Sequence, residues 1–287
     1  MVEEISSVIG KGFDTWKENL CICLPFVFSL VLTSVVGIII TGGAILATVP
    51  SLLPQFTTHD EVAPEAILLL LMPQILQSIG IITIALIVTM ILCMLIGAFF
   101  WAGAIGMAKE AIETGRTNIS HMIEYGKRKF ISLFFTDVII GLISSVGIVF
   151  LVPGILYIIP KLRALSELPP EELFTAVAVF GLGFLAMIVY TSIISIIFSL
   201  PRYAVVIDDV GAISGIKTGF KLFIRNKVAV FLLWLIVLAV SLIPMCFNAI
   251  QYLGGVIGMI LFVIIIQPLT VIWWSRLYLS MTEPAEE

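Results

Sequence analysis

Residues 78–107 read SIGIITIALIVTMILCMLIGAFFWAGAIGM, a run of apolar, small and hydroxyl-bearing side chains without a single charge. A helix needs about 20 consecutive apolar residues to cross the hydrocarbon core of a bilayer. This run is long enough, and five other runs of similar character occur along the chain. The sequence therefore predicts an all-α, polytopic integral membrane protein with six transmembrane helices. The predicted spans cover roughly residues 20–47, 78–107, 131–159, 173–200, 228–247 and 254–278.

The composition of the whole chain supports this class. Hydrophobic residues make up 60% of the 287 residues and charged residues 12%, and the mean hydropathy is +1.19. Soluble domains average roughly 45–50% apolar and about 25% charged residues. No basic face remains outside the short loops, so a nucleic-acid partner is not expected. The four cysteines are typical of small apolar packing residues, and they predict neither a disulfide framework nor a zinc site.

The distribution of Lys and Arg predicts the orientation in the membrane. Of the 15 such residues, all but Lys161 and Arg163 lie before span one, between spans two and three, between spans four and five, or at the end of span six. Cytoplasmic loops carry an excess of these two residue types. The sequence thus predicts a multi-pass protein of the cell (plasma) membrane with both termini in the cytoplasm.

An amphipathic stretch precedes each pair of spans on the predicted inner side. Apolar residues recur there at helical spacing on one face and charged residues occupy the other, as in helices that lie in the plane of the membrane interface. The three stretches share the pattern I-x-x-G-x-x-x-aromatic. Its residues are Ile9, Gly12 and Trp16; Ile123, Gly126 and Phe130; and Ile216, Gly219 and Phe223.

This shared pattern predicts three parallel repeats, each an interfacial amphipathic helix followed by a helical hairpin. Asn19 and Asn226 also fall in register behind it. The glycine is expected to let each amphipathic helix approach a neighbouring span closely. The units cover about residues 5–107, 117–200 and 211–280, within one transmembrane domain at 1–287.

Asp137 is a charged residue well inside a predicted span, and we group it with Thr136 and Gln267 as a candidate intramembrane polar site. An intramembrane carboxylate is costly, which makes it a candidate for transport or proton transfer. Alternatively, it hydrogen-bonds with a nearby hydroxyl or pairs with a basic residue such as Arg202. Gln267 and Pro268 interrupt span six, and the proline frees a backbone carbonyl one turn earlier. This predicts either a packing kink or a kink that lines a path.

Aromatic and basic residues near the predicted interfaces form a second set of candidates. Trp and Tyr favour the headgroup level, and Lys and Arg attract anionic headgroups. The predicted lipid contacts are Trp16, Lys127, Arg128, Lys129, Phe130, Phe223, Trp273 and Trp274. Two polar pairs, Asp208–Asp209 and Thr117–Asn118, are expected to cap the amphipathic helices that follow them.

Three segments resemble a known group of proteins. They are FDTWKENL at 13–20, AIETGR at 111–116, and RYAVVIDD at 202–209 with the helix that follows at 211–227. Together they resemble uncharacterised prokaryotic, largely archaeal, six-helix membrane proteins, which are similar to the membrane domain fused to some bacterial glycerophosphoryl diester phosphodiesterases. The resemblance covers most of the chain and implies the all-helical fold. It implies no catalytic residue, because no soluble segment is long enough for a phosphodiesterase domain.

No catalytic, metal or cofactor motif is apparent, so the sequence predicts a non-enzymatic protein without a cofactor. The leading hypothesis is a role in membrane organisation through binding of membrane lipids or of a protein partner, a homo-oligomer included. The alternative is a small-molecule or lipid transporter that uses Asp137 and the kink at Gln267–Pro268. The spans contain few polar side chains, which favours binding over transport.

Overall fold

The computed structural model describes residues 3–48, 64–159, 169–247 and 253–282, and every element in these ranges is helical. Among the described residues, six helical segments are long and apolar enough to cross a membrane, which confirms the six predicted spans. They cover Leu20–Thr48, Leu76–Thr114, Ile119–Ile158, Phe174–Ile207, Lys227–Cys246 and Gly254–Thr282.

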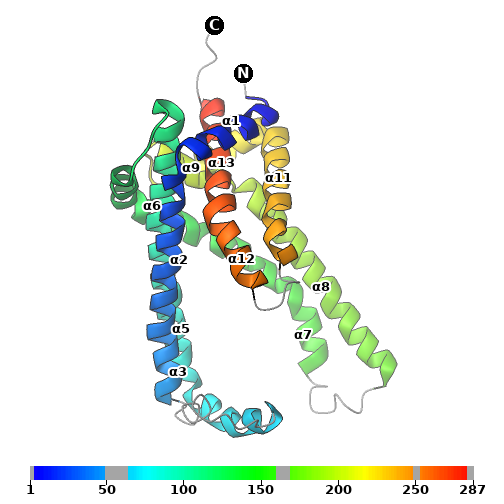
Figure 1. Cartoon of the computed structure of the whole chain (residues 1–287). Helices are drawn as coiled ribbons and strands as arrows, with labels where there is room; N and C mark the ends of the chain where they lie inside the picture. The colour runs from blue at the N-terminus through cyan, green and yellow to red at the C-terminus, as the bar shows by residue number, and fades with distance from the viewer. Residues whose placement is uncertain (1–2, 49–63, 160–168, 248–252, 283–287) are drawn as a thin grey trace.

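The first two spans form one arm of the molecule (Figure 1). The residues before span two belong to the same long helix as that span, and this helix continues through Pro73. The elements of this part are the amphipathic helix α1 (Ile5–Glu18), the 3₁₀ turn η1 (Leu20–Cys23), α2 (Leu24–Gly37), the π-turn η2 (Ile38–Gly42), α3 (Gly43–Thr48) and α5 (Pro64–Thr114).

The third and fourth spans form a second arm, which diverges from the first (Figure 1). A short buried helix follows this arm and lies among α5, α6, α10 and α13. The elements are α6 (Ile119–Ser145), the 3₁₀ turn η3 (Val146–Leu151), α7 (Val152–Ile158), α8 (Pro170–Ile197) and the short helix α9 (Pro201–Ile207). The predicted outer-loop cations Lys161 and Arg163 lie outside the described residues.

The last two spans supply the centre of the structure. In the most apolar stretch of the final span, 39% of the residues are buried inside the protein. The corresponding share is 6% in the spans that contain α5 and α8. The last helix of the final span packs against α1, α5, α9 and α11, so the arms face lipid while this helix faces protein. The elements are α10 (Ala212–Arg225), α11 (Lys227–Cys246), α12 (Gly254–Leu261), the π-turn η6 (Phe262–Ile266) and α13 (Gln267–Thr282).

Two of the three amphipathic stretches end in the same way. Asn19 and Asn226 have similar backbone angles, with φ of −129° and −128°, and each amide donates to a carbonyl four residues earlier at 3.1 Å. The equivalent position of the second stretch is Leu133, which has no amide, and α6 runs on without a break. The second stretch is therefore continuous with span three rather than a separate interfacial helix, which corrects the sequence prediction.

The glycines of the shared pattern are points of close contact, as expected from the sequence. A Cβ atom on Gly219 would lie 2.6 Å from the backbone nitrogen of Pro201, where no side chain fits. Such close approach is how helices associate in lipid, where the hydrophobic effect between helices is absent. The contacts are Gly12 with Trp273, Gly126 with Phe99, and Gly219 with Pro201.

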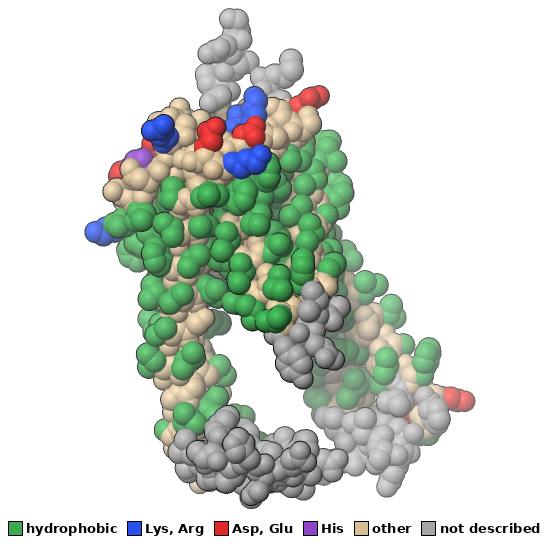
Figure 2. Space-filling model, in the orientation of Figure 1, with side chains coloured by type: hydrophobic (Ala, Val, Ile, Leu, Met, Phe, Trp, Pro, Cys, Tyr) green, Lys and Arg blue, Asp and Glu red, His purple; other side chains and the backbone are tan. Residues whose placement is uncertain are grey.

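Charged side chains gather at one end of the molecule, the end at which both chain termini lie, and a hydrophobic band follows beneath them (Figure 2). This arrangement is the one expected if that end lies in the cytoplasm. The orientation itself remains a prediction.

We expect Gly219→Ala to destabilise the protein by about 1–3 kcal/mol, because the added methyl group would meet backbone that cannot move aside. Gly10→Ala is the matched control. It lies in α1, nothing is within 4 Å of its Cβ position, and alanine favours a helix by up to about 1 kcal/mol. Thermal unfolding in a mild detergent measures both. Equal melting temperatures for the two variants would contradict the glycine contact.

Candidate functional site

An ion pair joins the second arm to the buried helix α9. The Nε atom of Arg202, near the start of α9, donates to Oδ1 of Asp137 on α6 at 2.7 Å. This bears out the open alternative that Asp137 pairs with Arg202. The guanidinium also lies over the ring of Trp101 on α5, with its carbon 5.1 Å from the ring centroid. The intramembrane carboxylate is therefore occupied by a protein partner.

Arg202 keeps most of its hydrogen-bonding capacity. A guanidinium has five N–H donors, and only the Nε–H of Arg202 donates to another described residue. Its side chain is 39% exposed, whereas that of Asp137 is 17% exposed. The remaining N–H groups are free to bind an anion from outside the protein.

Arg202 opens into a polar crevice between spanning helices. A cavity of about 300 Å³ is lined by residues of α5, α6, α8, α9, α11 and α13, Arg202 among them. A second cavity of about 410 Å³ continues between α8 and α11 and shares Ser195 and Trp234 with the first. We call these two adjoining cavities the Arg202 crevice.

Hydroxyl groups line the Arg202 crevice. Ser195 accepts a hydrogen bond from the indole of Trp234 at 3.0 Å and donates to the carbonyl of Ser192 at 2.8 Å. Serine and threonine in a helix commonly donate back to the preceding turn in this manner. Five hydroxyls of the crevice make no hydrogen bond with any described residue. They belong to Ser144, Ser192, Tyr203, Ser241 and Thr270.

Gln267 lies in a different cavity, of about 260 Å³, between α2, α5 and the last span. The π-turn η6 ends directly before it, so the interruption predicted at Gln267 and Pro268 appears as a widened turn. The Gln267 side chain makes no hydrogen bond within the described part of the chain. Trp101 lines both this cavity and the Arg202 crevice.

The predicted polar set does not form one site. Thr136 is fully buried and donates to the carbonyl of Ser132 at 2.8 Å. Asp137 belongs with Arg202, while Gln267 lies in the other cavity. Sequence reasoning counted Arg202 as a loop charge that sets the orientation and missed its place in a cavity. One feature of the sequence indicates this place: Arg202 directly follows Pro201, which starts a helix within an apolar run.

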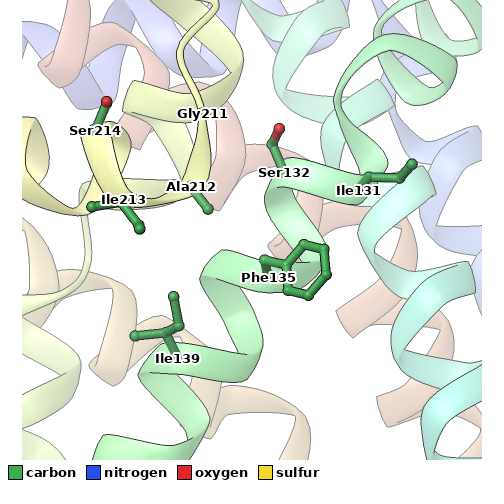
Figure 3. Close-up of a pocket in the computed structure, with 8 residues that line it drawn as sticks. All are labelled: Ile131, Ser132, Phe135, Ile139, Gly211, Ala212, Ile213 and Ser214. Atoms are coloured by element: carbon green, nitrogen blue, oxygen red, sulfur yellow. The ribbon is translucent and has the colours of Figure 1, made fainter.

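A fourth cavity, a groove of about 430 Å³, lies between α6 and the start of α10. In Figure 3, Ile139 of α6 and Ala212 and Ile213 of α10 point into the same space. No charged side chain lines the groove. It fits an apolar chain but offers little that selects one ligand from another.

Three of the predicted lipid contacts are buried in protein. Trp273 and Trp274 are each 5% exposed because α13 is the central helix, and the indole N–H of Trp273 donates to the carbonyl of Ile9. Lys129 is 7% exposed and pairs with Asp209, Nζ to Oδ1, at 2.6 Å. These residues do not anchor the protein in lipid, which corrects the prediction.

The other five predicted contacts keep some exposed surface. Lys127 and Arg128 are exposed, and Trp16, Phe130 and Phe223 are partly buried. Contact of these residues with lipid stays a prediction.

The acidic pair before α10 does not cap that helix. The residue at the N-cap is Gly211. Asp208 instead accepts a hydrogen bond from the hydroxyl of Tyr278, and Asp209 turns back to Lys129 with a positive φ of 58°. Both carboxylates thus tie α9 and α10 to neighbouring helices. Before α6, in contrast, Asn118 does cap, because its side chain accepts from the backbone N–H of His121 at 3.3 Å.

The Asp209–Lys129 contact predicts a dependence of stability on pH. The hydrogen bond from Lys129 and its charge lower the pKa of Asp209. A lowered pKa contributes stability above the ordinary pKa of about 3.9, and the contribution is lost as the pH falls through the folded-state value. We expect Asp209→Asn to cost about 1–2 kcal/mol at pH 7, a small value because the Asp209 side chain is 58% exposed.

Thermal unfolding of both proteins across pH measures this effect. The difference between wild type and Asp209→Asn should shrink as the pH falls below about 4. A difference that stays constant over that range would show that the charge of Asp209 is not what holds Lys129.

Among the described residues, no group of three or more His, Cys, Asp or Glu side chains is placed to hold a metal ion. The chemistry present is that of one guanidinium, free hydroxyls, an amide and aromatic rings. Such groups bind and orient a ligand.

The known proteins that this chain resembles are themselves uncharacterised. The sequence profile of a family described as "Domain of unknown function (DUF7847)" matches residues 65–273. An "Uncharacterized protein" from Archaeoglobus fulgidus is 26% identical over 289 residues, which cover 97% of this chain and 96% of that protein. No solved structure matches this chain. These findings fit the resemblance to uncharacterised archaeal proteins, and they show no link to a phosphodiesterase membrane domain.

Proposed function

Because the chain belongs to a family of unknown function, the one described as DUF7847, we propose its role from the site alone. We infer that it is a non-enzymatic membrane protein that binds a phosphate-bearing lipid, with the headgroup in the Arg202 crevice. The observation that carries this proposal is the set of unused N–H donors of Arg202, which open into a hydroxyl-lined cavity between spanning helices.

A phosphate group fits this set of donors. Guanidinium N–H groups bind phosphate oxygens in pairs, with charge-assisted bonds that are stronger than those between neutral groups. The hydroxyls of Ser144 and Thr270 line the same cavity and can donate to the remaining oxygens. Polar groups at membrane depth need partners, and a bound headgroup supplies them.

The shape of the crevice favours a lipid over a small soluble anion. Its second cavity continues between α8 and α11, where Val237 and Leu238 line one wall. Neighbouring side chains on the same two helices, such as Ile193 and Leu235, are about half exposed and face the hydrocarbon. A ligand with a phosphate head and an apolar chain matches both parts.

The contact of Asp137 with Arg202 bears on the transport alternative. Oδ1 of Asp137 accepts from Nε of Arg202 at 2.7 Å, so this oxygen already has a protein partner. The same contact gives Asp137 a different role, in which it competes with the headgroup for the guanidinium.

We expect Asp137→Asn to bind phosphatidic acid several-fold more tightly than the wild type, because the competing carboxylate is gone. The double variant Asp137→Asn, Arg202→Gln should bind it at least tenfold more weakly, since charge-assisted bonds contribute about 1.5–3 kcal/mol. Native mass spectrometry of the full chain in an uncharged detergent measures both. Diacylglycerol serves as the probe with the same chains and no phosphate.

The double variant Asp137→Asn, Lys221→Gln is the control with the same net charge as the Arg202 double variant, because exposed Lys221 of α10 lines none of the four cavities described above. It should bind phosphatidic acid as Asp137→Asn does. Equal binding by all variants, with unchanged melting temperatures, would overturn the proposal. A loss on Asp137→Asn alone would instead support transport or proton transfer.

We also propose that both termini lie in the cytoplasm of a cell membrane, on the strength of the charge distribution. In a cysteine-free background, a membrane-impermeant maleimide added to intact cells should label Glu171→Cys, at the start of α8. It should label Glu124→Cys, on α6, only after the cells are opened. The reverse pattern would invert the topology.

The threefold repeat is likewise a proposal. Its support is that each pattern glycine lies at a close contact and that Asn19 and Asn226 end their helices alike. Binding of a protein partner or of a second copy remains part of the proposal, and the exposed apolar arms leave surface for either.

A further inference from the structure

Trp101 is the shared wall of the two polar cavities. One face of its indole lies under the guanidinium of Arg202, and the ring of Phe26 meets it edge-on at 5.4 Å with an interplanar angle of 80°. Trp101 lines both the Arg202 crevice and the Gln267 cavity. Two binding environments, one charged and one neutral, therefore meet at one aromatic side chain.

The Gln267 cavity contains unused hydrogen-bonding groups. The amide of Gln267 and the hydroxyl of Ser29 both line it, and neither side chain bonds to another described residue. An amide offers two donors and one acceptor with two lone pairs. Gln267 is partly buried, and a polar group shielded from water without a partner costs free energy, so an occupant with hydrogen-bonding atoms is favoured there.

The local backbone also departs from a regular helix at this point. The π-turn η6 precedes Gln267 directly, and two of its residues, Phe262 and Val263, line the cavity. Single π-turns inside helices occur frequently at functional sites. The widened turn directly precedes Gln267, which lines the same cavity as Trp101.

Resting on the proposed function, we propose that the Gln267 cavity is the second subsite for the same ligand, and that it binds the glycerol-backbone oxygens of a glycerophospholipid. In such a lipid, the phosphate and the nearest backbone oxygen are on neighbouring carbon atoms, and the two cavities are neighbours that share Trp101. No charged residue lines the Gln267 cavity, which suits uncharged ester or ether oxygens. Its walls include Leu30 and Met259, against which the first carbons of the chains pack.

The test compares two probes on the purified full chain. Phosphatidic acid carries a phosphate and backbone oxygens, whereas dodecyl phosphate carries a phosphate alone. Gln267→Met keeps the length and shape of the side chain and removes its hydrogen bonds. It should weaken binding of phosphatidic acid roughly five- to tenfold, the effect of one lost hydrogen bond, and leave dodecyl phosphate unchanged. Ser29→Ala should act in the same direction by a smaller factor.

Ile264→Met is the control, because this residue belongs to the same π-turn but is 39% exposed on the outside of the protein. It should change neither affinity. Equal weakening of both probes by Gln267→Met, or of neither, would overturn the second subsite. The proposed function would still stand if the Arg202 double variant lost both probes. If that double variant lost neither, the proposed function and the second subsite would both fail.

Discussion

In a lipid-embedded protein, each polar group needs a partner inside the protein or a polar ligand, because the hydrocarbon offers none. The described part of this chain meets the requirement in most places. Lys129 is paired with Asp209, Asp208 with Tyr278, and Asp137 with Arg202. Each pair joins helices that are distant in the sequence, so the same contacts that satisfy the polar groups also hold the end of the bundle together. Among the described residues, the indole N–H of Trp16 and the hydroxyl of Ser275 are buried without a partner. Other side chains without a protein partner, such as Gln267, line the cavities of the candidate site.

Close packing supplies the rest of the cohesion. Helix association in lipid depends on van der Waals contact rather than on the hydrophobic effect, so small residues matter most where backbones meet. Gly219 meets Pro201 at the start of α9, and Gly12 meets Trp273 on α13. These contacts fix α9 and α13 between the amphipathic helices. Because Arg202 follows Pro201 directly, the packing that positions the proline also positions the guanidinium.

The sequence was sufficient for the parts of the structure that depend on composition. Six apolar runs predicted six spans, and the pattern glycines predicted close helix contacts. The prediction from sequence failed where the same residue type occurs both at the membrane interface and in the protein core. Trp273 and Trp274 beside Arg276 look like an interfacial anchor, yet the burial of α13 makes them core residues. The continuity of α6 was equally invisible in composition. The first and third amphipathic helices end at Asn19 and Asn226, where α6 has Leu133.

The polar residues of the site were harder to predict because their roles depend on contacts between distant segments. Asp137 and Arg202 are 65 positions apart, and the serines of the crevice come from several helices. A carboxylate that lined a transport path would need access to the transported ion, but here it holds a guanidinium whose other donors are free. The pair is better suited to regulating the strength of anion binding, because the carboxylate limits the charge that a headgroup meets. In the proposed function, this competition lets the site bind a lipid without holding it permanently.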